Sequence, residues 1–419
     1  MRMRKAILLI IVSALAACAQ TPATDVATGG AFDPARLARI ATAIEADIEA
    51  GKIPGAVALI VHGDDVVYHR SFGYADIASR TPMRNDAIFR IASMSKAVTT
   101  AGVMILYERG HFMLSDPVSK FLPEFADVEV IEAMSGDSIA ETRPAANEIR
   151  IIDLLTHTSG ISYPFIRSAV QQEYVDAGVI DGVTAADVSL ASVMQRLAEV
   201  PLLFDPGTDY AYGLSTDVLG YLIEVVSGMP LDRFFAEEIF APLGMDDTYF
   251  YLPAEKAARL VTLYADVDGL RVADGQESDI KIDNPRFPVE GARRYFSGGA
   301  GLSSTAMDYG RFLRMLLNDG ELDGVKLLSR KSVELMRAPR IDRDGDGTAE
   351  LALGFRVITD LGGESELGTP GLYSWGGAFY TSYWIDPQEE LVGVLMSQLI
   401  PATTDLAGRY RNLVYQALR

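Results

Sequence analysis

The chain has 419 residues, of which 49% are hydrophobic and 22% charged, and its formal net charge at neutral pH is -20. This composition is that of a globular protein long enough to bury a large core. Such an excess of negative charge repels phosphate backbones, so nucleic acid is excluded as a partner. With four histidines and one cysteine, a His/Cys metal site is not expected, and no disulfide can form within the chain.

The first 18 residues have the pattern of a targeting signal. Basic residues within the first five positions precede an apolar stretch over residues 6–17, which is about half the roughly 20 residues that a membrane-spanning helix needs. The stretch ends in Leu15-Ala16-Ala17-Cys18. This ending resembles a bacterial lipoprotein signal, in which the cysteine is lipidated. A plain secretory signal cleaved near Ala17 is the alternative.

These features predict where the protein resides. We expect residues 1–18 to be a lipoprotein signal peptide that ends at a lipidated Cys18. Residues 19–31 are rich in Thr, Ala and Gly and should form a flexible tether. A lipidated terminus anchors a protein to a membrane surface without spanning it. The expected location is the bacterial cell envelope, facing the periplasm, with a soluble periplasmic or secreted protein as the alternative.

The N-terminal part of the chain after the tether predicts a helix, a hairpin and a second helix. Asp33 and Pro34 form a helix start, and apolar residues at helical spacing continue to Gly51. Alternating apolar residues over 57–61 predict a half-buried strand, which a turn joins to a partner strand over 66–72. Residues 93–109 are mostly apolar at helical spacing, which predicts a buried helix.

The rest of the chain is mainly helical and then turns to strands. Residues 127–147 are polar and acidic, which indicates an exposed insertion. The pattern predicts an α+β fold, in which both ends of one domain (residues 32–419) build an antiparallel sheet flanked by helices, with a mainly helical region inserted over about residues 150–290. The later elements expected are a helix at 215–227, strands at 355–358, 373–384 and 391–397, and a closing helix at 405–419.

Ser93-Met94-Ser95-Lys96 is the central chemical signal. At a helix start, residues three apart share one face, so Lys96 can reach the Ser93 hydroxyl. A serine hydroxyl needs a base to become a nucleophile, and a lysine, with an ordinary pKa of about 10.4, can serve only where burial or a nearby cation favours its neutral form. Taken alone, the pattern also fits a capping serine and a solvated lysine.

Two further segments carry candidate site residues. Tyr212 lies between a Pro-Gly turn and the helix expected from Ser215, where its phenol could relay a proton beside a lysine. Trp375-Gly376-Gly377-Ala378 places glycines in a strand-like run, which permits the close approach of a ligand or another backbone. The N–H of Ala378 could then join that of Ser93 as an oxyanion hole. A core aromatic residue and a β-bulge are the respective alternatives.

In this order and separation, these features resemble the serine β-lactamase and penicillin-recognising superfamily, in particular its class C-like branch. The resemblance spans roughly residues 35–415. It implies a β-lactamase/transpeptidase-like fold, with Ser93 as nucleophile, Lys96 as general base and Tyr212 as the second proton-transfer residue. It extends to the stretches at 154–160, 204–208, 297–305 and 384–387.

Departures from the superfamily pattern point to one of its branches. Trp375 stands where β-lactamases have the lysine of K-T-G, and Leu214 where they have an asparagine. Both positions would otherwise help to hold a β-lactam. The combination is similar to family VIII carboxylesterases, which act on short acyl esters. We therefore expect Leu214, Trp375, Gly376 and Gly377 to contact the substrate.

The resemblance implies a carboxylesterase that works through an acyl-enzyme on a small-molecule ester, with no metal or organic cofactor. The alternatives are a β-lactamase or D-amino-acid-directed peptidase of the envelope, and a catalytically silent binding module. A His-based triad at His157 is disfavoured because no G-x-S-x-G elbow is present. The acidic run Asp342–Gly347 resembles the start of a calcium loop, although a plain acidic turn is favoured. The oligomeric state is left open.

Overall fold

The computed structural model describes residues 30–419 except 277, 280–281, 283 and 344–349. The expected signal peptide, Cys18 and most of the tether lie outside the described residues. So do residues 344–349, which contain most of the acidic run that resembles a calcium loop.

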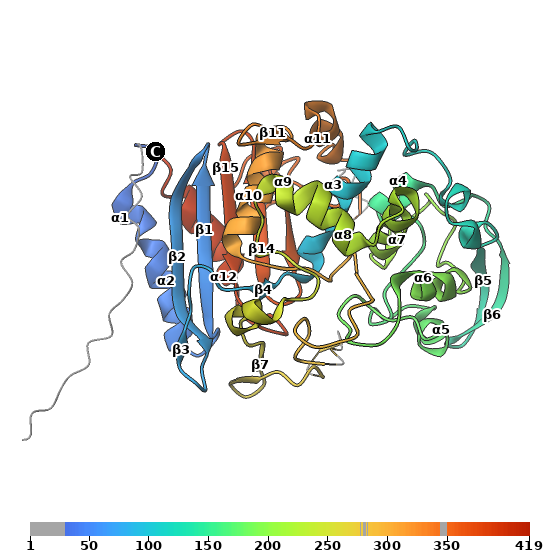
Figure 1. The fold of residues 1–419 in the computed structure, drawn as a ribbon, viewed down its shortest axis with the longest axis horizontal. Coiled ribbons are helices and arrows are strands. Elements are labelled where there is room, and N and C mark those ends of the chain that lie inside the picture. Colours follow the sequence, from blue (N-terminus) through green and yellow to red (C-terminus); the bar gives the residue numbers. More distant parts are fainter. Residues whose placement is uncertain (1–29, 277, 280–281, 283, 344–349) are drawn as a thin grey trace, which may run out of the picture.

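One seven-stranded sheet forms the frame of the molecule, and every neighbouring pair of its strands is antiparallel. Its N-terminal strand β1 pairs with its C-terminal strand β15 over Val57–His62 and Leu391–Met396, so the two ends of the chain meet in the sheet (Figure 1). This confirms the predicted fold class. The strand order is β12 (Arg356–Val357), β13 (Tyr373–Gly377), β14 (Thr381–Asp386), β15 (Leu391–Met396), β1 (Gly55–His62), β2 (Asp65–Asp76) and β3 (Thr81–Pro82).

Helices cover both faces of this sheet. The terminal helices α1 (Pro34–Leu37), α2 (Arg39–Glu49) and α12 (Leu406–Tyr415) pack together on one face, and α10 (Ala306–Leu317) lies on the other. As predicted, Asp33 caps the first helix, accepting hydrogen bonds from the two backbone N–H groups of Ala35 and Arg36. The strand β1 is buried on both faces, so the expectation of a half-buried strand is wrong.

The expected single strand at 373–384 is a hairpin. Strand β13 ends at Gly377, and a turn over residues 378–380 leads into β14, which starts at Thr381. The turn contains none of the Gly, Pro, Asn or Asp residues that signal a turn in a sequence. Tyr380 instead adopts a left-handed backbone conformation, with φ of 67°. This correction places Ala378 in a turn at the end of a strand rather than within one.

The helical region lies beside the sheet and its helices (Figure 1). The polar insertion expected at 127–147 contains a two-stranded hairpin of β5 (Glu129–Ser135) and β6 (Ser138–Pro144). Among the described residues, no helix has both the length and the apolar composition needed to cross a membrane. The remaining elements include α4 (Ile151–Leu155), α5 (Gln171–Asp176), α6 (Leu190–Ala198), α7 (Ser215–Ser227), α8 (Leu231–Phe235), α9 (Ala241–Leu243), α11 (Arg330–Met336), β4 (Phe89–Arg90), β5 (Glu129–Ser135), β6 (Ser138–Pro144), β7 (Tyr264–Asp266), β8 (Leu270–Val272), β9 (Ser303–Ser304), β10 (Glu321–Leu322) and β11 (Val325–Lys326).

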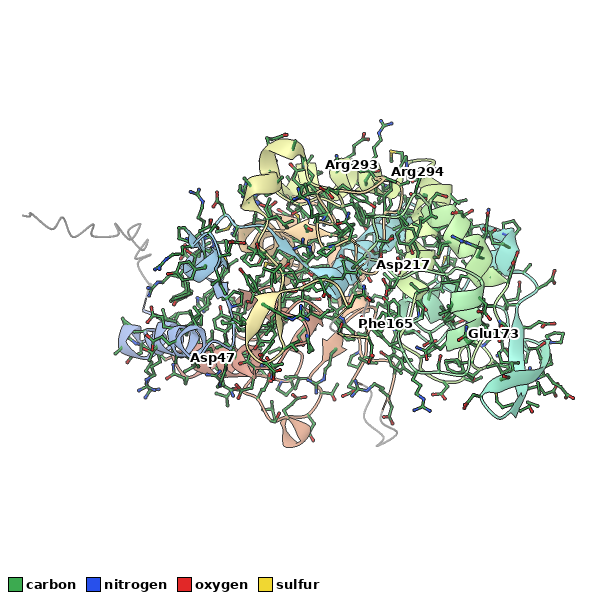
Figure 2. The ribbon with its side chains drawn as sticks, turned by 90° about the horizontal axis from the view of Figure 1, so that it is seen from below. Asp47, Phe165, Glu173, Asp217, Arg293 and Arg294 are labelled. Carbon is green, nitrogen blue, oxygen red and sulfur yellow. The ribbon has the colours of Figure 1, made fainter. Side chains whose placement is uncertain are left out.

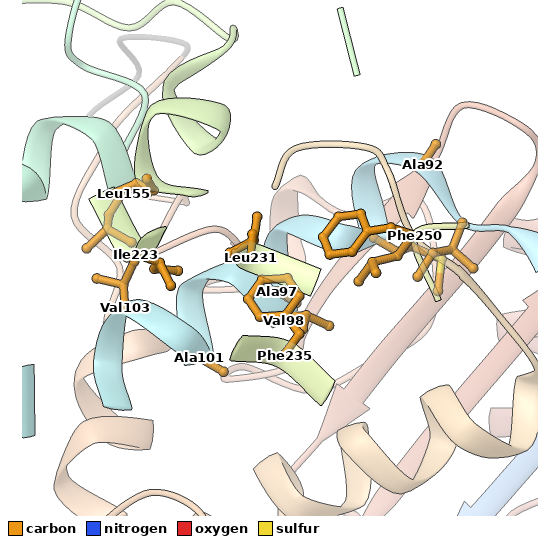
Figure 3. Packing of buried hydrophobic residues seen from close by; sticks show 14 of the residues in the cluster. Ala92, Ala97, Val98, Ala101, Val103, Leu155, Ile223, Leu231, Phe235 and Phe250 are labelled. Atoms are coloured by element: carbon orange, nitrogen blue, oxygen red, sulfur yellow. The ribbon is translucent and has the colours of Figure 1, made fainter. Parts of the chain in front are cut away.

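Helix α3 (Ser95–Glu108) runs through the centre of the molecule, between the sheet and the helical region. Its residues from Ser95 to Leu106 are all buried, as the apolar pattern predicted. Figure 3 shows its side chains beside those of neighbouring helices. Gly102 allows α7 and α8 to pack close to α3, because a Cβ there would lie 3.1 Å from Ile223 and 3.2 Å from Phe235. The middle of α3 is thereby packed tightly in the core.

Candidate active site

Ser93 lies in a single 3-10 turn, η1 (Ala92–Met94), that leads directly into α3. Ala92 has φ of 42°, a conformation that a residue with a side chain rarely adopts and that costs free energy. The turn is held by hydrogen bonds from the Met94 N–H to the Ile91 carbonyl (3.1 Å) and from the Ile91 N–H to the Leu302 carbonyl (3.0 Å). Ser93 is therefore presented on a strained and well-anchored turn.

Ser93, Lys96 and Tyr212 converge in the structure. The Tyr212 hydroxyl donates to Ser93 Oγ at 2.8 Å, and Lys96 Nζ lies 3.3 Å from the same oxygen. Lys96 is only 1% exposed, and its Nζ also lies 4.7 Å from the centre of the Tyr212 ring. All three predicted catalytic side chains are thus within reach of one another, although Tyr212 is 119 residues away from Ser93 in the chain.

Two further partners of Lys96 were not predicted from the sequence. Its Nζ lies 2.9 Å from the Tyr163 hydroxyl and donates to the Gly299 carbonyl at 2.8 Å. The Tyr163 hydroxyl and the Gly299 carbonyl therefore hold the amine of Lys96 beside Ser93 Oγ.

Asp217 of α7 holds the glycine-rich segment that carries Gly299 in place. Ser297 Oγ donates to Asp217 Oδ1 at 2.5 Å, and Asp217 is wholly buried. This burial raises the pKa of the Asp217 carboxyl. A Cβ on Gly299 would lie 2.5 Å from Asp217 Oδ2, so only glycine fits there. In the sequence, the run of glycines near residue 298 indicates this close approach between the backbone and the Asp217 side chain.

Aromatic rings enclose the three side chains. The Tyr212 ring has neighbours on three sides, with centroid distances of 4.9 Å to His157, 5.4 Å to Tyr163 and 5.9 Å to Trp375. Phe165 stacks on Tyr163 at 4.6 Å. Figure 2 shows Phe165 and Asp217 in the middle of the molecule. Aromatic and imidazole rings therefore surround Tyr212, whose hydroxyl donates to Ser93.

The hairpin of β13 and β14 closes the other side of the site. Gly377 packs against the segment before Ser93, because a Cβ there would lie 2.3 Å from the Ile91 carbonyl oxygen. This is the close backbone approach that the two glycines predicted. The N–H of Ala378, the next residue, has no hydrogen-bond acceptor among the described residues. Gly376 is exposed and Trp375 half-buried, so both remain accessible to a substrate.

Leu214 does not fit its predicted role. Its side chain is wholly buried in the larger hydrophobic core, at the position immediately before α7. It therefore offers no surface to a substrate and instead anchors the loop that carries Tyr212. A sequence motif shows which residue occupies this position but not which way its apolar side chain points.

A small cavity of about 10 Å³ borders Lys96. Such a volume holds about one water molecule or a methyl group. Trp375, Tyr210 and Phe355 form its aromatic walls. The remaining lining residues are Thr156, His157, Leu351, Ala352 and Gly354.

Within the part of the chain that the structure describes, no three His, Cys, Asp or Glu side chains gather closely enough to hold a metal ion. The acidic run at 342–347 is described only as far as Arg343. The hypothesis of calcium binding at that run therefore stays a prediction.

His157 should make the fold sensitive to acid. Burial, and secondly the charge of Lys96, lower the pKa of His157 from its ordinary 6.5 to about 3. The folded protein therefore binds fewer protons than the unfolded chain between these values, and the free energy of unfolding should fall as the pH drops below about 6.5, by up to about 1.4 kcal/mol per pH unit. Urea unfolding at pH 7, 6, 5 and 4 measures this slope.

His157→Asn is the matched variant, because its side-chain oxygen can still accept from the Gly213 N–H, which lies 3.4 Å from His157 Nδ1. The variant should lose stability less steeply between pH 6.5 and 4 than the wild type. Parallel slopes in the two proteins would contradict the role of His157, since other titrating groups are common to both.

This fold and this serine–lysine–tyrosine cluster define a serine hydrolase of the β-lactamase fold. A family model described as Beta-lactamase matches residues 40–417, and the chain belongs to that family. The predicted resemblance is thereby confirmed.

Named relatives narrow the comparison. The chain is 35% identical to Protein Rv1367c of Mycobacterium tuberculosis over 84% of its own length and 88% of that protein. It is 31% identical to Esterase EstB of Burkholderia gladioli, covering 86% of this chain and 90% of the esterase. Among solved structures, EstCE1, described as a hydrolase with promiscuous acyltransferase activity, superposes with a TM-score of 0.77 at 28% identity, covering 91% of this chain and 98% of EstCE1.

Proposed function

We propose that the protein is a carboxylesterase that hydrolyses short, uncharged esters through an acyl-enzyme on Ser93. The observation that carries this proposal is the convergence of Lys96 Nζ and the Tyr212 hydroxyl on Ser93 Oγ, at 3.3 and 2.8 Å. The esterase activity named for EstB and the hydrolase activity named for EstCE1 support the same reaction class.

In the first half of the reaction, Ser93 Oγ attacks the ester carbonyl carbon while its proton passes to the neutral amine of Lys96. The backbone N–H groups of Ser93 and Ala378 hold the negative charge that develops on the carbonyl oxygen. Tyr212 transfers a proton to the leaving oxygen and is reprotonated from Lys96. The alcohol departs, and the acyl group remains bound to Ser93 Oγ.

In the second half, water attacks the acyl carbon, and its proton passes by way of the Tyr212 hydroxyl to the amine of Lys96, which later returns it to Ser93. The same N–H groups stabilise the second tetrahedral intermediate. When this intermediate collapses, Ser93 Oγ takes back a proton and the carboxylic acid leaves. The enzyme returns to its starting state with no net change in protonation, apart from ionisation of the product acid in solution.

The character of the site supports the substrate class. Trp375 replaces the cation with which β-lactamases hold a carboxylate, and it stands 5.9 Å from Tyr212, between ring centres. An apolar wall at this point favours a neutral substrate. The resemblance to family VIII carboxylesterases extends the proposal to short acyl chains.

A substrate panel on the purified mature protein tests this proposal. We expect turnover of p-nitrophenyl acetate and butyrate, with little activity on the decanoate and on nitrocefin, a chromogenic β-lactam. Fast nitrocefin hydrolysis without ester turnover would favour the β-lactamase alternative. A protein that turns over neither substrate and forms no adduct with a fluorophosphonate would be the silent binding module.

We also propose that Cys18 is lipidated and anchors the enzyme in the bacterial envelope. The support is the position of the only cysteine in the chain directly after a short apolar segment. Cells fed labelled palmitate should incorporate label into the wild type and none into Cys18→Ala. Equal labelling of the two proteins would contradict lipidation at this residue.

A further inference from the structure

Gln398 is a wholly buried amide that has no role in the mechanism above. It follows β15 by two residues. A buried amide is costly unless its donors and acceptors are paired. Its partners therefore show what the side chain holds together.

The first partner is the backbone of Arg90, three residues before Ser93. Gln398 Oε1 accepts from the Arg90 N–H at 3.2 Å, and Gln398 Nε2 donates to the Arg90 carbonyl at 3.1 Å. The side chain thus pairs with both polar groups of one residue, as a neighbouring strand would. This contact fixes the backbone that leads into the nucleophile turn.

The second partner is the turn that carries Ala378. Gln398 Nε2 donates to the Ser397 carbonyl at 2.8 Å and also lies 3.5 Å from the carbonyl of Phe379, the residue after Ala378. The Phe379 carbonyl accepts from the Leu399 N–H at 3.1 Å. The Ser397 N–H donates to the Tyr380 carbonyl at 3.0 Å in the same turn. Gln398 therefore lies between the segment that leads to Ser93 and the turn that contains Ala378.

The Arg90 side chain holds Gln398 in this orientation. Arg90 Nη1 donates to Gln398 Oε1 at 3.3 Å, so the amide oxygen must face Arg90. The rest of the guanidinium donates to the carbonyl oxygens of Phe287, Val261 and Pro285, at 2.6, 3.1 and 2.9 Å. Burial lowers the pKa of Arg90 only to about 10, so it stays charged at neutral pH.

An oxyanion hole works only when its donors are held in place before the reaction. Donors must lie within about 3 Å of the developing charge. A misplacement of about 1 Å can cost on the order of 100-fold in rate. Ser93 and Ala378 lie 285 positions apart in the chain (378 minus 93), so their separation depends on contacts across the sheet.

We propose that Gln398 is a positioning residue that sets the separation between the N–H groups of Ser93 and Ala378. This role of Gln398 rests on the proposed function, because it assumes that these two N–H groups form the oxyanion hole. Gln398 touches neither group itself. It acts through Arg90 on one side and Phe379 on the other.

The test compares p-nitrophenyl acetate with its thionoester, in which sulfur replaces the carbonyl oxygen. Sulfur is larger and accepts hydrogen bonds weakly, so an oxyanion hole favours the oxygen ester. In Gln398→Met, which keeps the length of the side chain but has no amide, kcat for the oxygen ester should fall about 10- to 100-fold. The kcat for the thionoester should fall less. The ratio of the kcat for the oxygen ester to the kcat for the thionoester should therefore decrease about tenfold.

Gln398→Glu is the second variant, because it keeps an acceptor for Arg90 and should fold even if Gln398→Met does not. It loses the donor to the Arg90 carbonyl and should also show a narrowed ratio. Ser397→Ala is the matched control, because Ser397 is equally buried and its Oγ donates to the Gly55 carbonyl at 2.7 Å, away from the site. It should keep the wild-type ratio.

A wild-type ratio in a folded Gln398 variant would overturn the inference, as would an equal narrowing in Ser397→Ala. Failure of the proposed function gives a different result, in which the wild type itself turns over neither ester. The two outcomes are therefore distinguishable in one experiment.

Discussion

Replacing Ser93 by alanine should abolish ester turnover, lowering kcat on the order of 10⁴-fold or more. Ser93 Oγ is the oxygen on which Lys96 and Tyr212 converge, at 3.3 and 2.8 Å. Without it no acyl-enzyme can form, and neither neighbour can replace the nucleophile. Release of p-nitrophenol from the acetate and butyrate esters, corrected for spontaneous hydrolysis, measures the effect.

Ser95→Ala is the matched control within the same motif. Ser95 is buried, and its Oγ accepts from the Leu302 N–H at 3.1 Å rather than facing Ser93. This variant should lose some stability but keep kcat within about tenfold of the wild type. Equal activity of Ser93→Ala and the wild type would contradict the mechanism. A larger loss of activity in Ser95→Ala than in Ser93→Ala would show that Ser93 is not the nucleophile.

The second large effect is expected at Lys96. Lys96→Met should lower kcat/KM about 10³-fold or more, because the side chain that accepts the Ser93 proton is gone while the hydroxyl remains. KM should change little, since Lys96 is buried and the substrate meets Ser93 first. Steady-state kinetics with p-nitrophenyl acetate separates the two parameters.

Lys120→Met serves as the control for the loss of a lysine, because its side chain is 56% exposed and pairs with Asp116 on the surface. It should leave kcat/KM unchanged. The thermal stability of both variants must be measured as well, because Lys96→Met leaves the Gly299 carbonyl without its hydrogen-bond donor. Wild-type kinetics in a folded Lys96→Met would show that another group removes the proton.

Elements with strong local signals were predicted well from the sequence. The helix from Ser215 to Ser227 has the predicted bounds, because its apolar stripe ends at Gly228, whose φ of 70° suits a residue without a side chain. Asp33 and Pro34 likewise marked the start of the first helix. In these cases neighbouring residues alone determine where the element begins or ends.

Elements that depend on tertiary contacts were predicted less well. Residues 378–380 include none of the residues typical of turns, and Tyr380 adopts a positive φ there. Alternating apolar residues in β1 predicted one buried face, but α10 and the terminal helices bury both. A pattern within one strand cannot show how many layers cover it.

The candidate site likewise contains residues that a local motif marks and residues that only the fold brings together. Ser93, Lys96 and Tyr212 could be named because they belong to motifs with a known spacing. Tyr163 could not, because its contact with Lys96 joins residues 67 positions apart and no pattern around it is distinctive. Asp217 looked like an ordinary residue in the first turn of a helix, and only the fold places it behind the glycine-rich segment.

Covalent capture by a fluorophosphonate tests the central claim most directly. This reagent phosphonylates an activated serine, and trypsin should then release the peptide Ile91–Lys96, which contains both Ser93 and Ser95. The account predicts one adduct per chain, located on Ser93 by fragmentation of that peptide, and markedly slower labelling of Lys96→Met. A label on Ser95 or elsewhere, or no label on a folded wild-type protein, would contradict it.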